Sequence, residues 1–137
     1  MLPVDVVKAF VLRVNAGDVE GLSSLLTEDA RLIDCLGQSI RGREEAQSHW
    51  KNFFSVVHDY QITAKQWVSS WPLVILFGEE AGSYAIAGSP LALKRRIVTP
   101  AAFRVVVPGQ LIAEWQVYAA EGEATRRQQQ YAQRAAA

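Results

Sequence analysis

Apolar residues near the N-terminus recur every three to four positions, which is the spacing of an amphipathic helix. The members of this stripe are Val7, Phe10, Val11 and Val14. The polar segment 15–18, Asn-Ala-Gly-Asp, ends the pattern, because its glycine adopts a positive φ without strain and its aspartate can cap a following helix. The sequence therefore predicts a first helix with one buried face and a second, short helix over residues 19–26.

Apolar and polar residues alternate over the segment 31–36, which is typical of a strand whose successive side chains point to opposite faces. Asp34 then shares a face with the two leucines of this segment, and Cys35 points to the other face. A carboxylate among apolar neighbours needs a hydrogen-bond partner or a function. We interpret Asp34 either as an acid/base or ligand-contacting residue, or as a group held by a backbone amide or by Arg41.

The rest of the chain predicts one more helix and four strands. An apolar stripe through Trp50 and Phe53 indicates a helix over 43–57. The predicted strands cover residues 60–69, 73–87, 91–107 and 110–119. Short turns rich in Gly, Pro and Ser link them, so we expect consecutive antiparallel hairpins, with a bend at Gly78 or Gly82. The order of elements predicts an α+β fold, in which an antiparallel sheet curls around the long first helix and leaves a pocket.

Composition narrows the possible functions. A chain of 137 residues is expected to form one domain over 1–121, followed by a polar tail over 122–137. Its 14 basic and 14 acidic residues cancel, so no net charge favours nucleic acid or an anionic membrane. The lone Cys35 excludes an internal disulfide and fits a reducing, cytoplasmic compartment. We also expect no metal site, no membrane span and no signal peptide, because the spacings and apolar runs that these require are missing.

Three stretches of the sequence resemble the nuclear transport factor 2-like superfamily, and within it the ketosteroid isomerases and the SnoaL-like polyketide cyclases. The stretches are the first helix with NAGD and LTEDARLIDCLG, the segment RGREEAQSHWKNFF, and AFRVVVPGQLIAEWQVYAAE. The resemblance implies a cystatin-like, cone-shaped fold, in which a strongly curved antiparallel sheet wraps around the N-terminal helix. It also implies a small, mostly apolar molecule as the ligand, and a homodimer formed through the outer face of the sheet.

The same resemblance assigns a role to Asp34, which matches the carboxylate that moves a proton in the isomerases without a cofactor. Their two oxyanion donors fall on Phe10 and near Ala101, neither of which can donate a hydrogen bond. Losing one such donor typically costs about 2.7–4 kcal/mol of transition-state stabilisation, which argues against steroid isomerase activity. We therefore expect isomerisation, cyclisation or dehydration of another substrate. The alternatives are a non-catalytic ligand-binding module and a dimerisation domain with a relic cavity.

Residues from the helices and from the inner face of the sheet are expected to line the pocket. These residues are Phe10, Val14, Trp50, Phe53, Phe54, Tyr84, Ala101, Phe103, Glu114, Gln116 and Tyr118. For the last strand, periodicity and resemblance disagree. Periodicity alone places Trp115 in the core, whereas the resemblance implies that Glu114 lines the cavity and that the Trp115 side meets a second subunit. Glu80 and the adjacent Glu79 are expected to form a solvated edge, and His49 is expected to face solvent or an edge.

Overall fold

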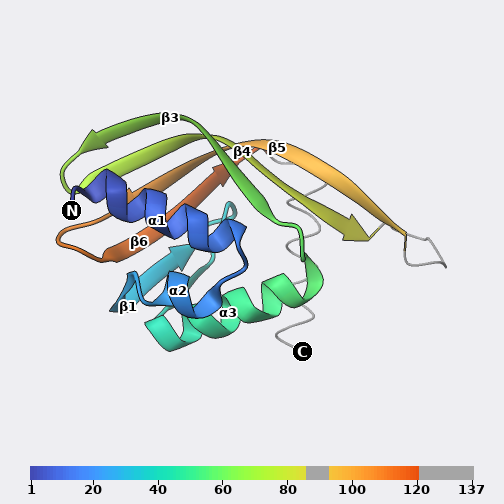
Figure 1. The fold of residues 1–137 in the computed structure, drawn as a ribbon, viewed down its shortest axis with the longest axis horizontal. Helices are drawn as coiled ribbons and strands as arrows, with labels where there is room; N and C mark the ends of the chain where they lie inside the picture. The colour runs from blue at the N-terminus through green and yellow to red at the C-terminus, as the bar shows by residue number, and fades with distance from the viewer. Residues whose placement is uncertain (86–92, 121–137) are drawn as a thin grey trace.

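The computed structural model describes residues 1–85 and 93–120 (Figure 1); the predicted turn at 88–90 and the tail over 122–137 lie outside them. The described part contains three helices and six strands. They are α1 (Pro3–Asn15), α2 (Val19–Ser23), β1 (Leu26–Ile33), β2 (Ser39–Arg41), α3 (Arg43–Val56), β3 (Gln61–Ser70), β4 (Leu73–Ala85), β5 (Lys94–Val106) and β6 (Ile112–Ala119).

The chain enters the sheet earlier than the alternation over 31–36 predicts. Helix α2 ends at Ser23, and β1 begins at Leu26, which pairs with Ile112 of β6. The backbone amide of Ile112 donates to the carbonyl of Leu25 at 2.8 Å. Strand pairing therefore overrides the helical spacing of the leucines in this segment, because tertiary contacts outweigh the small differences in helix propensity.

The six strands form one sheet in the order β2-β1-β6-β5-β4-β3. All neighbouring pairs are antiparallel except β1 and β6, which run parallel. The expectation of a wholly antiparallel sheet is therefore wrong for this one pair. Strand β2 was not expected either, because its three residues lie in the segment 37–42, which carries no alternating pattern.

The sheet is strongly curved, and its long strands β3, β4 and β5 arch over α1 (Figure 1). Gly78 of β4 pairs with Ala64 of β3, next to a shift in register between Ala64 and Gln66. A Cβ atom at position 78 would lie only 1.9 Å from the carbonyl oxygen of Thr63, so no side chain fits there. The close approach of the two backbones at Gly78 confirms one of the two predicted bend positions.

Aromatic side chains from α1, β5 and β6 pack together in the interior of the curved sheet. The ring of Trp115, which is 2% exposed, lies 4.8 Å from that of Phe10 and 5.1 Å from that of Phe103. Trp115 also pairs with Val105, which is fully buried. Periodicity therefore predicts the orientation of β6 correctly.

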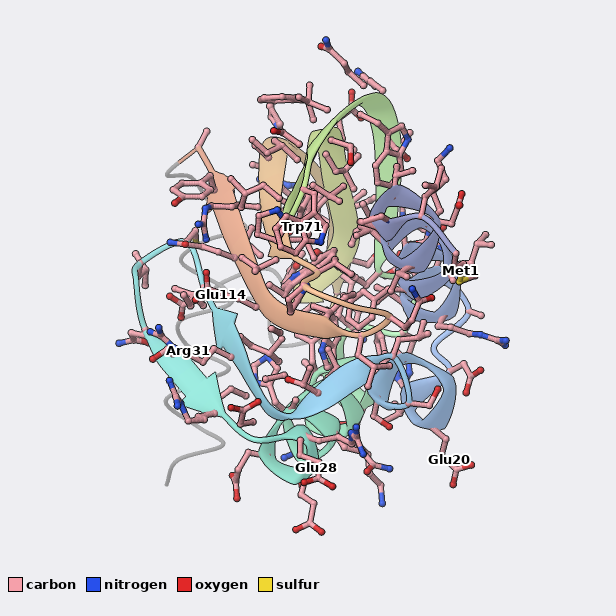
Figure 2. All side chains as sticks on the ribbon, turned by 90° about the vertical axis from the view of Figure 1, so that its left-hand side faces the viewer. Met1, Glu20, Glu28, Arg31, Trp71 and Glu114 are labelled. Atoms are coloured by element: carbon pink, nitrogen blue, oxygen red, sulfur yellow. The ribbon has the colours of Figure 1, made fainter. Side chains whose placement is uncertain are left out.

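The orientation that the resemblance implies for β6 is wrong. Glu114, Gln116 and Tyr118 alternate with Trp115, so they face away from the interior, and Tyr118 is 51% exposed. Glu114 binds Arg31 at 3.5 Å and Arg104 at 2.5 Å on that outer face. Figure 2 shows Glu114 and Arg31 on the side of the molecule opposite α1. The Trp115 side is consequently occupied by the core of the same chain and cannot meet a second subunit.

Neither a membrane-spanning helix nor a metal-binding cluster is found in the described residues. No helix among them is both long and apolar enough to cross a bilayer. Within the same ranges, no three His, Cys, Asp or Glu side chains gather in a way that could hold a metal ion.

The orientation of β6 predicts a large difference between two aromatic substitutions on this strand. Trp115→Ala removes a ring packed on Phe10 and Phe103, and it should lower the free energy of unfolding by about 3–5 kcal/mol. Tyr118→Ala removes a ring from the outer face and should change it by about 1 kcal/mol or less. Urea denaturation of both variants, at protein concentrations too low for self-association, measures the difference, and a larger loss for Tyr118→Ala would contradict this orientation.

Candidate functional site

A buried pair of polar side chains lies inside the sheet. Tyr60, just before β3, is 5% exposed, and Glu80 of β4 is 3% exposed. The hydroxyl of Tyr60 donates a hydrogen bond of 2.6 Å to a carboxylate oxygen of Glu80. The expectation that Glu80 belongs to a solvated edge is therefore wrong.

Strand alternation explains why Glu80 points inward. On β4, the side chains of Val74, Leu76 and Tyr84 are buried, and Glu80 shares their parity. Glu79 has the opposite parity and pairs with Lys65 on the exposed side. The alternation was visible in the sequence, and it would have placed Glu80 on the same face as the predicted pocket residue Tyr84.

Two pairs of hydrogen bonds act as clamps on the chain on either side of Tyr60. The Asp59 carboxylate accepts hydrogen bonds from the backbone amide and the hydroxyl of Ser83 on β4, at 2.8 and 2.6 Å. On the other side, the Asn15 side chain binds the backbone amide and carbonyl of Ile62, at 2.7 and 2.9 Å. Tyr60 is thereby fixed between the end of α1 and the strand that carries its partner Glu80.

Further polar groups lie within electrostatic reach of Tyr60. Its pKa is raised well above the ordinary value by burial, by the charge of Glu80 and the hydrogen bond to it, and then by Tyr84 and Cys35. Cys35 lies in the turn after β1, and Tyr84 lies on β4. The interior therefore gathers Tyr60, Glu80, Tyr84 and Cys35 from three separate segments of the chain.

Aromatic rings of α3 form a wall around the phenol ring of Tyr60. The Phe53 ring lies 4.9 Å from Tyr60, and the Trp50 ring lies 6.3 Å from it. Trp50 in turn lies 5.4 Å from Phe54 and 6.3 Å from Phe10 of α1, measured between ring centroids. These contacts connect the helical stripe predicted for residues 43–57 to the buried polar pair.

Asp34 lies outside this interior cluster, in the turn between β1 and β2. Its Oδ1 atom accepts hydrogen bonds from the backbone amides of Leu36 and Gln38, both at 2.9 Å. Of the alternatives drawn from the sequence, the structure thus shows a bond to backbone amides, a contact that closes tight turns. The side chain is half-buried and carries its charge close to His49.

The surroundings of His49 act on it in two opposite ways. Loss of hydration lowers the pKa of the imidazole below its ordinary value, and the charge of Asp34 acts in the opposite direction. Part of the side chain is still exposed, as the sequence predicts. His49 and Asp34 therefore form a pair of polar side chains close to Trp50, one of the rings of the aromatic wall.

The structure brings together most of the predicted pocket residues. Those with buried side chains near the interior are Phe10, Val14, Trp50, Phe53, Tyr84, Ala101 and Phe103, and Phe54 is half-buried. Glu114, Gln116 and Tyr118 are not part of this group, because they lie on the outer face of β6. Sequence reasoning missed Tyr60 and Glu80, which supply the buried polar pair.

Comparison with solved structures relates the architecture to cystatin-fold and nuclear transport factor 2-like proteins. A candidate SnoaL-like polyketide cyclase from Shewanella denitrificans matches with a TM-score of 0.80 and 14% identity, over 93% of this chain and 97% of that chain. A cystatin-fold protein from Novosphingobium aromaticivorans matches with a TM-score of 0.71 and 20% identity, over 85% and 97%.

A third solved structure, also similar in fold, contains a small molecule. It is a ketosteroid isomerase-like protein from Catenulispora acidiphila in complex with trimethylamine, with a TM-score of 0.70, 19% identity, and coverage of 82% of this chain and 83% of that chain. No curated protein matches the sequence. At these identities the structures establish the fold alone.

Together, the curved, unclosed sheet and its enclosed helix define an α+β domain of the nuclear transport factor 2-like superfamily. The sequence model of the SnoaL-like domain matches residues 7–115, which is most of the chain. The protein belongs to the SnoaL-like domain family.

The shifted pKa of Tyr60 predicts a loss of stability at high pH. Because its pKa is higher in the folded than in the unfolded state, its contribution is complete below the unfolded value of about 10 and is lost as the pH rises towards the folded value. Tyr60→Phe should therefore lose less stability than the wild type between about pH 9 and pH 11.5. Urea denaturation across this range measures the difference. The exposed Tyr118→Phe is the control, and equal slopes for Tyr60→Phe and wild type would contradict the prediction.

Proposed function

We propose that this SnoaL-like domain binds a small, mostly apolar molecule on the concave side of the sheet, against α1 and α3. We propose further that it transfers a proton within that molecule without a cofactor, in an isomerisation, cyclisation or dehydration. The observation that carries the proposal is the Tyr60–Glu80 pair, which is buried among aromatic rings. An apolar interior of this kind suits an apolar ligand, and the buried acid supplies the directional polar contact that such sites need.

Glu80 suits acid/base chemistry because of its surroundings. A carboxyl group enclosed by apolar side chains loses the hydration that stabilises its charged form, whereas a hydrogen bond donated by a phenol favours that form. The two effects oppose each other, and enzymes adjust their acid/base residues by effects of this kind. The clamps around Tyr60 fix the phenol, so the Glu80 carboxylate is held in one orientation towards a bound molecule.

Asp34 is the second candidate for the acid/base residue. It matches the base position in the resemblance to the isomerases, and its charge lies near His49. One of its carboxylate oxygens is already occupied by two backbone amides of the β1–β2 turn. We therefore assign proton transfer to Glu80 in preference to Asp34.

A non-catalytic binding module is the alternative function. The neighbour from Catenulispora acidiphila is in complex with trimethylamine, so a small organic molecule binds a protein of this fold. In that case the Tyr60–Glu80 pair would anchor a ligand without changing it.

The lone cysteine and the absence of a membrane-spanning helix from the described residues agree with a proposed location in the cytoplasm.

Exchange of carbon-bound protons separates these functions. With 2-acetylnaphthalene in D₂O, wild-type protein should exchange the acetyl methyl protons faster than buffer does, as followed by proton NMR. Glu80→Gln keeps an acceptor for the Tyr60 hydroxyl but removes the acid, so it should slow the catalysed exchange by about 10²-fold or more. Asp34→Asn is the matched control, because it keeps an acceptor for the turn amides, and it should leave the rate nearly unchanged.

The other possible results of this experiment assign the function differently. A loss of exchange in Asp34→Asn alone would transfer the role of base to Asp34. If the wild-type protein binds the ketone but exchanges none of its protons, this result would exclude proton transfer and favour the binding module.

We also propose that the domain forms a homodimer through the outer face of the sheet, on the side away from Trp115. Phe77 of β4 pairs with Ala102 of β5, which pairs with Tyr118 of β6, so the three residues form one row on that face. Phe77 is 43% and Tyr118 51% exposed, and Val68 and Val98 on the same face are also exposed. A continuous apolar row of this kind on a sheet is typical of an interaction surface.

A charge in the middle of this row should separate the subunits. Phe77→Glu should convert the dimer to a monomer in sedimentation velocity, because the carboxylate would be buried without a partner in the interface. Leu12→Glu, which alters an exposed position on α1, is the control and should remain dimeric. A wild-type protein that sediments as a monomer at high concentration would contradict the dimer.

A further inference from the structure

Trp50 carries a buried hydrogen-bond donor that has no acceptor in the described part of the chain. The side chain is 6% exposed, and its indole Nε1 is enclosed without a hydrogen-bond partner in residues 1–85 and 93–120. Buried donors of this kind are rare, because the group loses its hydrogen bonds to water and gains nothing in return. A specific reason is therefore needed for an indole at this position.

Packing alone gives no such reason. The neighbours of Trp50 on the inner side of α3 are Phe53 and Phe54, whose rings fill space without a polar atom. Elsewhere in the chain, the indole of Trp71 donates to the carbonyl of Pro108 at 3.3 Å, although Trp71 is 70% exposed and could bind water instead. Of these two tryptophans, the exposed Trp71 has an acceptor, and the buried Trp50 has none among the described residues.

The unpaired donor lies in the same wall as the buried acid. The Trp50 ring is 6.3 Å from the ring of Tyr60, whose hydroxyl binds Glu80, and 6.3 Å from the ring of Phe10. This apolar region therefore contains two directional groups of opposite kind, an acceptor at Glu80 and a donor at Trp50. A molecule bound at the site proposed above, against α1 and α3, would lie beside both groups.

We propose that the indole N–H of Trp50 donates a hydrogen bond to a neutral carbonyl oxygen of the bound molecule. Trp50 then selects apolar ligands that carry this oxygen over hydrocarbons of the same shape. A neutral oxygen fits better than an anion, because an anion in this apolar interior would lie near the Glu80 carboxylate and lose its hydration. The inference rests on the proposed function, and it adds a residue that determines specificity.

A matched pair of probes tests the selection directly. 2-Acetylnaphthalene and 2-isopropenylnaphthalene have nearly the same shape, but the first carries a carbonyl oxygen where the second carries a CH₂ group. Wild-type protein should bind the ketone about tenfold more tightly than the alkene, as measured by calorimetry. Trp50→Phe should lower this preference to about twofold or less, because the phenyl ring has no donor.

The indole proton gives a second readout in the wild-type protein. In the ¹⁵N-labelled protein, the Trp50 indole signal should move downfield with the ketone and stay in place with the alkene. The indole signal of Trp71 is the internal control, because its donor already has an acceptor in the protein. Trp71→Phe identifies that signal at an exposed position without disturbing the core.

The results separate this inference from the proposed function. Equal affinity for both probes, with an unmoved Trp50 signal, would overturn the role of Trp50 and leave ligand binding intact. An indole proton that contacts bound water equally in both complexes would overturn it as well, because water would then be the missing acceptor. Binding of neither probe would contradict the proposed function itself, together with the inference that rests on it.

Discussion

The contact of Phe10 with Trp115 and Trp50 fixes which side of the sheet is the interior. Phe10 is fully buried in α1, and its ring meets β6 through Trp115 and α3 through Trp50. Because side chains alternate along a strand, the inward position of Trp115 sets the directions of the residues from Glu114 to Tyr118, and pairing transmits them to β5 and β4. The inward direction of Glu80 and the outward direction of Glu114 both follow from this one constraint.

The same constraint makes the Tyr60–Glu80 pair energetically demanding. A carboxyl group on the inner face of the sheet has exchanged water for aromatic rings, and the Tyr60 hydroxyl is the partner that the structure shows for one of its oxygens. Natural interiors keep such groups only where hydrogen bonds satisfy them or where function requires them. The clamps through Asn15 and Asp59 add four further hydrogen bonds on the two sides of the tyrosine.

The sequence predicts the local elements well and the long-range contacts poorly. The stripes of α1 and α3 are visible because burial of one helix face imposes a regular spacing, and alternation alone orients Trp115 correctly. The parallel pairing of β1 with β6 joins two segments that lie far apart in the sequence, and no local pattern encodes it. The sequence pattern places Asp34 on a strand because Leu36 keeps the alternation. In the structure, however, Leu36 lies in a turn and is 40% exposed. Glu80 is missed for the opposite reason, since two adjacent glutamates suggest a surface while strand parity places one of them inside.

The two acids, Asp34 and Glu80, therefore differ in what their surroundings allow them to do. Asp34 accepts hydrogen bonds from two backbone amides of the β1–β2 turn, and its charge acts on His49. Glu80 is bound by a side chain, and a side-chain hydroxyl can donate or accept a hydrogen bond as the charge on its partner changes. The position that the resemblance assigns to a donor is Phe10, which has none, but the ring of Phe10 lies against the indole of Trp50, whose N–H has no acceptor among the described residues. A donor and an acid thus occur together in this interior, supplied by helix α3 and strand β4 instead of the positions that the resemblance assigns.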